Sequence, residues 1–247
     1  MQFNFNYILE ALIPVLRGLP VTLFVVSFSM AAAFPLGFFL ALLVSKRKGA
    51  ASGLGALFVS FMRGTPMIVQ IYVVFFSLPG ILAFLAGQLK LSINVYQINP
   101  LVYAVIVFTL NTCAVFCEIF RSALHTVGPA QMEAALSSGL TEAQGYWRVV
   151  IPQMMEAACA PLATASIELM KNSSLVFYMT VMDIMGIIKT TAAEGYNYLE
   201  GYTLAWIIYL VLCYGVEFIW FLAEKRLKSR RSRESVKNSG EREKKYA

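Results

Sequence analysis

Five long apolar runs constrain this chain more strongly than any other feature of its sequence. They lie at residues 20–44, 66–86, 100–124, 152–177 and 202–223. A helix needs about 20 apolar residues to cross a hydrocarbon core of ~30 Å, whereas a transmembrane β-barrel is built from alternating segments of about 10 residues, which the sequence lacks. Charged residues make up only 14% of the chain and hydrophobic residues 58%. We therefore predict an all-α integral membrane protein with five transmembrane helices.

Positive charge is concentrated in alternate connections between these runs. Residues 46–48 read Lys-Arg-Lys, and Arg121 and Arg148 flank the connection after the third run. Residues 224–247 hold 10 Lys or Arg against 4 Glu, whereas the other connections hold one lysine each. Because Lys and Arg accumulate on the cytoplasmic side, we predict that the N-terminus is outside, the C-terminus is inside and the connection at 128–151 is cytoplasmic.

The two ends of the chain are expected to lie outside the transmembrane domain, which is predicted at residues 20–223. Residues 1–19 are expected to form an interfacial helix. Its apolar side chains are Phe3, Phe5, Ile8, Leu9, Leu12, Ile13 and Leu16. Residues 224–247 are predicted to be a basic cytoplasmic tail with a disordered end, which fixes the topology and contacts anionic membrane lipid. No nucleic-acid partner is expected, because no nucleic-acid-binding fold accompanies the charge.

The connection between the third and fourth runs is a polar island with its own helical pattern. We predict a short helix over residues 131–138, a break at Gly139 and a second short helix over residues 141–150. Ala134 and Ala135 would let the first helix fit closely into a groove on a partner. Glu133 would offer a charge to the rim of that groove, and Gly139 permits the left-handed turn that ends the helix. A loop with this much structure is expected to be bound by another protein.

Two kinds of site are missing from the sequence pattern. No GxxxxGK[ST] segment is present, so an ATP site would have to belong to another subunit. Four cysteines lie inside apolar runs, without a CxxC motif or a Cys/His cluster, and are expected to be small packing residues. They are Cys113, Cys117, Cys159 and Cys213. No metal site is predicted.

A basic motif precedes the second run and reads Arg63-Gly64-Thr65-Pro66, with Gln70 following. Thr65 can cap a helix that begins at Pro66, which would leave Arg63 at the inner interface. An ordinary arginine that reaches the interface beside a helix start would give the same pattern.

Polar residues inside the third run form two further groups. Glu118 and Arg121 stand three residues apart, so the two charges lie side by side on a helix and partly neutralise each other in a low dielectric. Such a pair has a structural explanation as well as a transport one. Asn111 and Thr112 lie mid-run and either bridge helices or line a pathway.

The end of the fourth run carries the polar stretch Lys171-Asn172-Ser173-Ser174. Lys171 lies about 28 Å along a straight helix from Pro152 and therefore toward the outer side. The three residues that follow could interrupt the helix and offer backbone and hydroxyl groups to a ligand, as discontinuous helices do. A Glu168–Lys171 pair with serines bonded back to the helix is the alternative.

Taken together, these motifs resemble those of permease subunits of ATP-binding-cassette (ABC) importers for polar amino acids. The island resembles the EAA loop of such permeases, and the basic motif resembles their RGTPxxVQ segment. The charge pair resembles ExxR, and the polar stretch resembles K-x-T-S-L, with Ser173 where the family usually has threonine. The motifs occur in the family's order, and the resemblance covers nearly the whole chain outside the basic tail.

The resemblance implies a type I importer fold with a cytoplasmic coupling helix, in a multi-pass protein of a bacterial cytoplasmic membrane. It implies a second permease subunit, identical or related, two ATP-binding-cassette ATPase subunits and an extracytoplasmic substrate-binding protein. The chain itself would be no enzyme and would need no cofactor, because ATP and Mg²⁺ would bind the ATPase subunits. A faint likeness of residues 183–186 (Asp-Ile-Met-Gly) to the cystine-type branch ranks cystine among the candidate substrates.

The residues assigned from these motifs fall into three groups. Contact with the ATPase subunit is assigned to Glu133, Ala134, Ala135 and Gly139. A substrate pathway is assigned to Asn111, Thr112, Glu118, Lys171, Asn172, Ser173 and Ser174. Structural roles are assigned to Arg63, Thr65, Pro66, Gln70, Arg121 and Pro152.

Two other functions are compatible with the same membrane topology. A stand-alone secondary transporter or channel would need no nucleotide-binding partner, and a membrane scaffold could use the same loop to recruit a soluble protein. Neither the transported solute nor the choice between identical and related permease subunits follows from the sequence.

Overall fold

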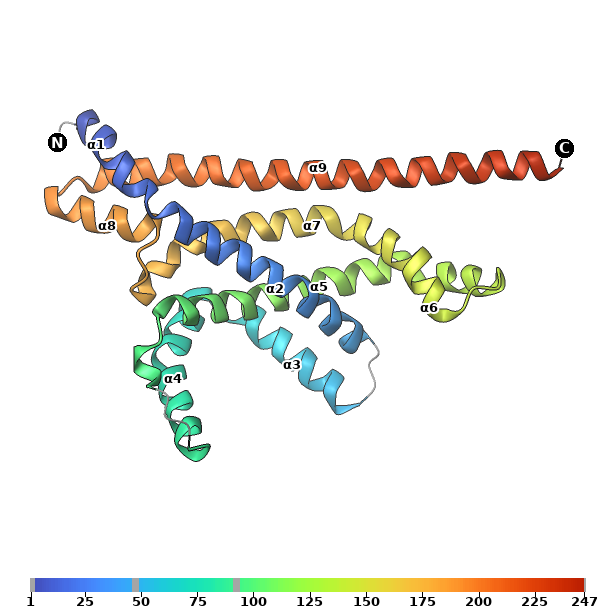
Figure 1. The fold of residues 1–247 in the computed structure, drawn as a ribbon, viewed down its shortest axis with the longest axis horizontal. Coiled ribbons are helices and arrows are strands. Elements are labelled where there is room, and N and C mark those ends of the chain that lie inside the picture. Colours follow the sequence, from blue (N-terminus) through green and yellow to red (C-terminus); the bar gives the residue numbers. More distant parts are fainter. Residues whose placement is uncertain (1–2, 46–48, 91–93, 247) are drawn as a thin grey trace.

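The computed structural model describes residues 3–45, 49–90 and 94–246, with side chains as far as Ser229 (Figure 1). Every regular element in these residues is a helix. The long helices are α2 (Leu19–Ser45), α5 (Pro100–Ser137), α7 (Ile151–Asn172) and α9 (Tyr198–Tyr246). The shorter elements are α1 (Phe5–Leu16), α3 (Ala50–Gly64), α4 (Met67–Gln88), η1 (Val95–Gln97), α6 (Glu142–Gly145), η2 (Tyr146–Val150), η3 (Ser173–Met179) and α8 (Ile184–Gly195).

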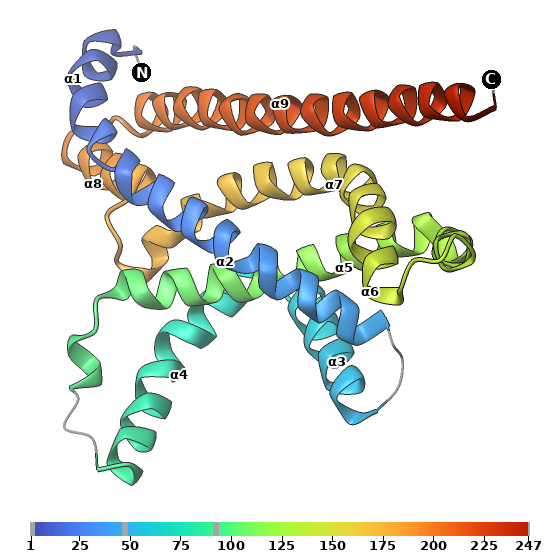
Figure 2. The ribbon, with the colours of Figure 1, turned by 45° about the vertical axis from the view of Figure 1, so that its right-hand side comes forward.

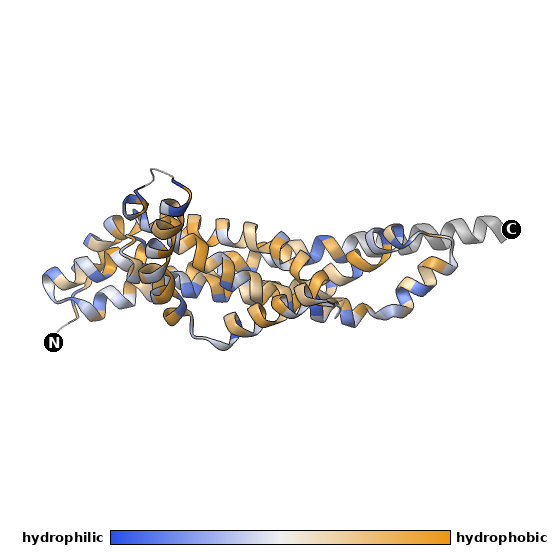
Figure 3. Cartoon of the chain, turned by 90° about the horizontal axis from the view of Figure 1, so that it is seen from below, coloured by the Kyte–Doolittle hydropathy of each residue, from blue (hydrophilic) through white to orange (hydrophobic). Residues whose placement is uncertain are grey.

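The long helices lie side by side along one axis, with the two chain ends at opposite ends of it (Figure 1). In the part of the chain that is described, four helices are long and apolar enough to cross a membrane, and a bent segment through α7 and α8 makes a fifth. Apolar residues are concentrated along the middle of the long axis, with more polar residues toward both ends (Figure 3). The prediction of an all-α membrane protein is therefore confirmed, with four or five candidate spans.

Helix α5 is the centre of the bundle and packs most closely against α2. Small residues recur every four positions on the facing side of α2, at Ser29, Ala33, Gly37 and Ala41, and all four are buried. A Cβ on Gly37 would lie 2.9 Å from the Cβ of Phe116 on α5. Because lipid tails are as apolar as the side chains, helices in a bilayer associate mainly through such close packing. The spacing of small residues therefore fixes the register of α2 on α5.

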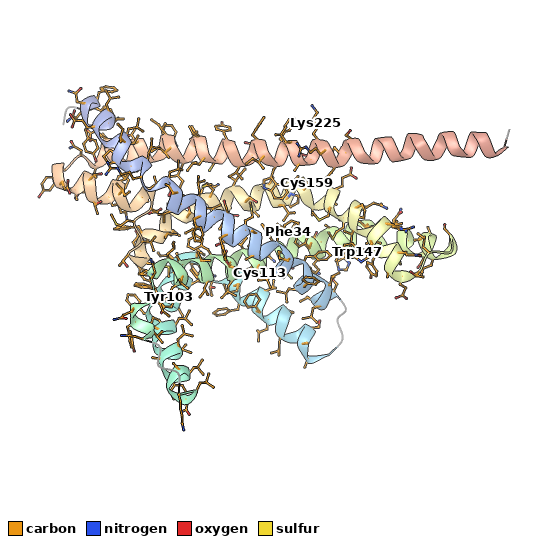
Figure 4. All side chains as sticks on the ribbon, in the orientation of Figure 1. Phe34, Tyr103, Cys113, Trp147, Cys159 and Lys225 are labelled. Carbon is orange, nitrogen blue, oxygen red and sulfur yellow. The ribbon has the colours of Figure 1, made fainter. Side chains whose placement is uncertain are left out.

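The buried cysteines contribute to the same packing. Cys113, Cys117 and Cys159 are buried, Cys213 is partly buried, and all four are free thiols. Cys113 and Cys117 belong to the core cluster that joins α2, α5 and α7. Their role as small packing residues agrees with the prediction; Cys113 and Cys159 are labelled in Figure 4.

The sequence did not predict helix α3, which lies between α2 and the second predicted span, α4. It has 15 residues, too few for a span, and its Gly, Ser and Ala content hides it from a search for apolar runs. It packs back on α2, where a Cβ on Gly55 would lie 3.0 Å from Leu40. Helices α3 and α4 then diverge from a corner against α5 (Figure 1).

The corner between α3 and α4 is formed by two extended residues, Thr65 (φ −115°, ψ 141°) and Pro66 (φ −62°, ψ 138°). Proline disfavours a helical conformation in the residue before it, which explains why α3 stops here. Thr65 does not cap α4 as predicted; its hydroxyl donates to the carbonyl of Phe61, in the last turn of α3, at 2.9 Å. Arg63 stands about 20 Å along α3 from its first residue, at about 1.5 Å per residue. Its predicted place at the inner interface stays a prediction.

The predicted fourth run, residues 152–177, lies within one continuous helical segment, and the chain bends only after Met179. The α-helical part ends at Asn172 and continues as the 3₁₀-helix η3. Thr180 then adopts a left-handed conformation (φ 60°), and α8 leaves at 56° to the preceding helix. The helix change begins at the Asn-Ser-Ser stretch, where the sequence predicted an interruption.

The two terminal segments differ in their agreement with expectation. Helix α1 buries Ala11 and Val15 against α8 and α9 and leaves Phe5, Leu9 and Ile13 exposed in one row. Contact of this row with a membrane surface stays a prediction. The C-terminal tail, for which the sequence predicted a disordered end, continues α9 without a break to Tyr246. Lys, Arg and Glu are good helix formers, and the tail contains no proline to stop the helix.

Candidate functional site

The connection between α5 and α7 begins at a sharp turn. Gly128 has φ 70° and ψ 165°, so the helix that ends before it and the short helix over residues 129–137 point in different directions. In Figure 2 the short helix turns away from the axis of α5 at the end of the bundle. Positive φ with extended ψ is essentially restricted to glycine.

The short helix ends in a complete Schellman motif. Gly139 adopts φ 82°, its N–H donates to the carbonyl of Leu136 at 2.9 Å, and the N–H of Leu140 donates to the carbonyl of Ala135 at 3.1 Å. These two bonds satisfy helix carbonyls that would otherwise lack partners. The predicted break at Gly139 and its left-handed conformation are confirmed.

The second half of the connection is capped at its start. Thr141 accepts from the Gln144 N–H at 3.3 Å, and the Gln144 side chain accepts from the Thr141 N–H at 3.0 Å. This reciprocal pair is a capping box. Helix α6 follows and passes through the π-helical turn η2 directly into α7, with Pro152 in its first turn. The predicted helix over 141–150 is therefore two short elements joined to α7.

The short helix packs against α6 through small residues. A Cβ on Gly145 would lie 2.7 Å from the Met132 sulfur and 3.4 Å from the Ala135 Cβ. Ala135 is accordingly buried, whereas Glu133 and Ala134 are exposed. The two alanines thus divide their roles: Ala135 holds the loop together and does not face outward, contrary to expectation.

The connection between α5 and α7 also carries exposed apolar side chains. Leu136 is 41% exposed, Tyr146 44% and Trp147 70% (Trp147 is labelled in Figure 4). We call these three residues, together with Glu133 and Ala134, the loop surface. The sequence prediction missed Tyr146 and Trp147, although a Tyr-Trp pair inside a polar island was a signal for an exposed aromatic contact.

A cluster of charges lies deeper in the bundle, between α3 and α5. Arg121 donates from Nε to Glu118 Oε2 at 3.0 Å and from Nη2 to Glu118 Oε1, so the pair is bidentate. Arg63 Nη1 reaches Glu118 Oε2 at 3.9 Å. The predicted Glu118–Arg121 pair is confirmed, and Arg63 joins it from the end of α3.

This cluster borders a hollow of about 540 Å³ between α2, α3 and α5. The lining residues are Val44, Ser45, Gly49, Ser52, Gly53, Ala56, Val59, Ser60, Arg63, Cys117, Glu118, Arg121 and His125. His125 lies one turn from Arg121 on the side toward Gly128. The hollow therefore extends from the end of α2 and the start of α3 to the charge cluster, beside the segment of α5 that leads into the loop.

Gln70 joins the α3–α4 corner to α5. Its Nε2 donates to the carbonyl of Met62 at 2.7 Å and to the Thr65 hydroxyl at 2.8 Å, and its Oε1 accepts from Asn111 Nδ2 at 2.9 Å. Gln70 is buried. The geometry thus favours helix bridging for Asn111. Thr112, the neighbour of Asn111, is buried in the core.

Lys171 and its neighbours lie apart from the hollow. Lys171 and Glu168 are both exposed, and no ion pair joins them among the residues with described side chains. Ser173 donates to the Met170 carbonyl at 2.7 Å and Ser174 to the Lys171 carbonyl at 2.8 Å. The alternative of back-bonded serines is therefore observed, without the ion pair, and the predicted pathway residues do not form one site within this chain.

The break after η3 is held in place by buried polar contacts that the sequence prediction missed. Asp183 is fully buried, caps α8 by accepting from the Gly186 N–H at 2.8 Å, and accepts from the Tyr209 hydroxyl at 3.4 Å. The Ile184 N–H donates to Thr22 at 3.3 Å. A Cβ on Gly18 would lie 2.5 Å from the backbone carbonyl carbon of Asp183. The break is thus fixed to the start of α2 and to α9.

Comparison with known proteins places this architecture in a family. The family described as "Binding-protein-dependent transport system inner membrane component" matches residues 33–229. The chain belongs to this family. The resemblance stated from the four motifs is therefore confirmed, and the family's match ends before the last part of α9.

Two similar relatives come from Bacillus subtilis (strain 168). The L-cystine transport system permease protein TcyL is 32% identical over 231 residues, which cover 94% of each chain. The arginine transport system permease protein ArtQ is 29% identical over 229 residues, covering 93% of this chain and 99% of ArtQ.

Solved structures agree on the fold. A chain from the "Crystal structure of an amino acid ABC transporter with histidines" superposes with a TM-score of 0.75 at 24% identity, over 92% of this chain and all of that one. A chain from "Inward facing conformations of the MetNI methionine ABC transporter" gives 0.68 at 18% identity, over 86% of this chain and 95% of that one. The chain has the type I ABC importer permease fold.

Proposed function

We propose that this chain is the permease subunit of an ABC importer for an amino acid, and that its loop surface is the contact for an ATPase subunit. The observation that carries the proposal is the loop itself, a short helix with a Schellman motif at its end and a capping box after it. Glu133 and Ala134 are exposed on it. Local bonds hold the loop's shape, so a partner can move it as one body.

The orientation follows from charge. The end of α2, the loop and the C-terminal half of α9 lie at the same end of the long axis (Figure 1). These are the places where positive charge gathers in the sequence. Because Lys and Arg favour the cytoplasmic side, that end is inside, the N-terminus is outside, and the protein spans a bacterial cytoplasmic membrane.

The partners follow from the family. The importer contains a second permease subunit, two ATPase subunits that bind ATP and Mg²⁺, and an extracytoplasmic substrate-binding protein. ATP-driven closure of the ATPase subunits moves the loop surface, and Gly128 converts this movement into tilting of α5. The tilt alternates the pathway between outward-open and inward-open states. The chain itself catalyses no reaction.

The substrate is a polar amino acid, and L-cystine is the first to test. TcyL, named for cystine transport, is 32% identical over 94% of both chains, and ArtQ, named for arginine transport, is 29% identical. Both compounds carry an α-ammonium and an α-carboxylate, so the shared chemistry is zwitterionic.

Copurification and uptake test the proposal together. The tagged permease is expected to copurify with an ATPase, and membranes with the complete system are expected to take up amino acid in the presence of ATP. Glu133→Arg reverses an exposed charge on the loop. We expect it to reduce both the copurification of the ATPase and the uptake of amino acid by at least about tenfold, since like charges across an interface cost several kcal/mol. Glu142→Arg, which reverses another exposed charge of the connection outside the loop surface, is the matched control.

The outcomes separate the alternatives. Uptake that needs no ATPase, with Glu133→Arg fully active, would favour a secondary transporter or channel. A bound soluble partner without any solute uptake would favour a scaffold. Either result would overturn the importer assignment.

A further inference from the structure

The hollow between α2, α3 and α5 contains more positive than negative side chains. Arg63 and Arg121 line it together with a single carboxylate, Glu118, and His125 lies on the same wall. Ionisable groups placed along a membrane span are costly and usually face a water-filled cavity that serves a function. An uncompensated positive charge in this position favours an anionic ligand.

The two arginines differ in how they are bound. Both oxygens of Glu118 accept hydrogen bonds from Arg121. Arg63 approaches the same carboxylate only to 3.9 Å, which is beyond hydrogen-bonding distance. Among the side chains described, no acceptor bonds to the Arg63 guanidinium, and the side chain is 50% exposed. Arg63 thus presents N–H donors to the hollow in the fork that matches a carboxylate.

The rest of the wall leaves room for a small ligand. The face of α3 toward the hollow carries Ser52, Gly53, Ala56 and Ser60, which are short side chains. A volume of about 540 Å³ lies within the range of roughly 300–1,000 Å³ usual for small-molecule sites. The hollow runs from Gly49 to Arg63, about 20 Å along α3 at about 1.5 Å per residue.

We propose that Arg63 binds the α-carboxylate of the transported amino acid in this hollow, on the inner half of the pathway. The inference rests on the proposed function and adds to it a site and a chemical group. Glu118 neutralises one of the two guanidinium groups, so the hollow keeps about one net positive charge. A transport pathway needs binding strong enough for entry and weak enough for release, and this arrangement provides a single weakly held anion site.

Paired ligands with and without a carboxylate test the proposal. The probes are radiolabelled L-cystine and L-arginine, with cystamine and agmatine as their decarboxylated counterparts. Whichever amino acid the wild-type importer takes up in proteoliposomes is then used for equilibrium binding, in detergent, to the nucleotide-free complex of permease and ATPase subunits without the substrate-binding protein. Arg63→Gln removes the charge, Arg63→Lys keeps the charge without the fork, and Arg17→Gln is the control at the end of α1, outside the hollow.

We expect wild-type protein to bind the amino acid more tightly than the decarboxylated amine. Arg63→Gln should weaken amino-acid binding about ten- to a hundredfold, the loss expected for a hydrogen bond to a charged group, and should abolish the difference between the two ligands. Arg63→Lys should be intermediate, and Arg17→Gln should bind as wild type. Melting temperatures of the complexes show whether each variant is folded.

Three results would overturn the inference. Unchanged affinity in folded Arg63→Gln would remove Arg63 from the pathway. Arg63-dependent binding of inorganic phosphate or of phosphatidylglycerol vesicles, in a complex whose amino-acid binding does not depend on Arg63, would make the hollow a phosphate or lipid-headgroup site. Wild-type complex that takes up no amino acid would refute the proposed function itself, whereas intact uptake with unaltered binding in Arg63→Gln refutes the inference alone.

Discussion

Helix α7 lies between two irregular segments that are stabilised in opposite ways. The loop before it is held by local bonds, such as Leu140 N–H to Ala135 and the reciprocal pair of Thr141 and Gln144. The break after η3 is held by distant partners, since the Ile184 N–H donates to Thr22, 162 positions away. The loop can therefore keep its shape while it moves, whereas the break ties three helices together and resists movement.

A glycine serves a different purpose in the loop and at the contact between the break and the start of α2. Gly139 needs its positive φ of 82°, and nothing lies within 4 Å of the place where its Cβ would be. Gly18 needs space, because its Cβ would lie 2.5 Å from the Asp183 backbone. Substitutions at the two sites should therefore separate stability from coupling.

The largest effect is expected at the break, from Gly18→Ala. A backbone neighbour cannot rotate away as a side chain can, so we expect a stability loss of about 1–3 kcal/mol or more and a clearly lower melting temperature in detergent. Gly215→Ala makes the same chemical change inside α9, where no atom lies within 4 Å, and should melt at or slightly above the wild-type temperature, because alanine favours a helix more than glycine does. Equal melting of both variants would show that the break is not tightly seated.

The next effect is expected in the loop, from Gly139→Val. A β-branched residue at positive φ costs about 1–3 kcal/mol of local strain, which should distort the loop surface. Uptake per ATP hydrolysed should fall severalfold in proteoliposomes, with the melting temperature of the bundle nearly unchanged. Gly139→Asn is the control, since asparagine tolerates the left-handed region. Unaltered coupling in the valine variant would argue against the loop as the transmitting element.

The smallest effect is expected from Asp183, where two substitutions refine the comparison. Asp183→Ala removes the cap of α8 and the partner of Tyr209, and loss of a cap costs about 0.5–2 kcal/mol. Asp183→Asn keeps an oxygen that can accept from Gly186 and should lose less. Thermal melting that ranks wild type above Asn above Ala would support the capping role, and the reverse order of the two variants would contradict it.

The sequence predicted what depends on local pattern. Apolar runs gave the helical membrane class, the capped loop was recognised around Gly139, and the three-residue spacing of Glu118 and Arg121 predicted their pair. Each of these features is determined by residues close together in the chain.

The rest depends on packing between distant segments. Helix α3 was missed because it is stabilised by α2 and α5, through Gly55 and its neighbours, and not by an apolar run of its own. Ala135 is buried because it packs against Gly145. Asp183 is held in place by its hydrogen bond from Tyr209 and by the hydrogen bond between its neighbour Ile184 and Thr22. No periodicity within one helix reports these contacts.

Accessibility of Ala134 in the assembled importer tests the central claim most directly. Ala134→Cys places a thiol on the loop surface, and Ala51→Cys places one on an exposed alanine of α3 as the control. The labelling rate with a maleimide is measured with and without the ATPase subunits, with the parent protein as background. We expect the ATPase to slow labelling at position 134 by at least about tenfold and to leave position 51 unchanged, as expected for a residue enclosed by an interface. Equal labelling at position 134 with and without the ATPase, in a complex that still transports, would contradict the account.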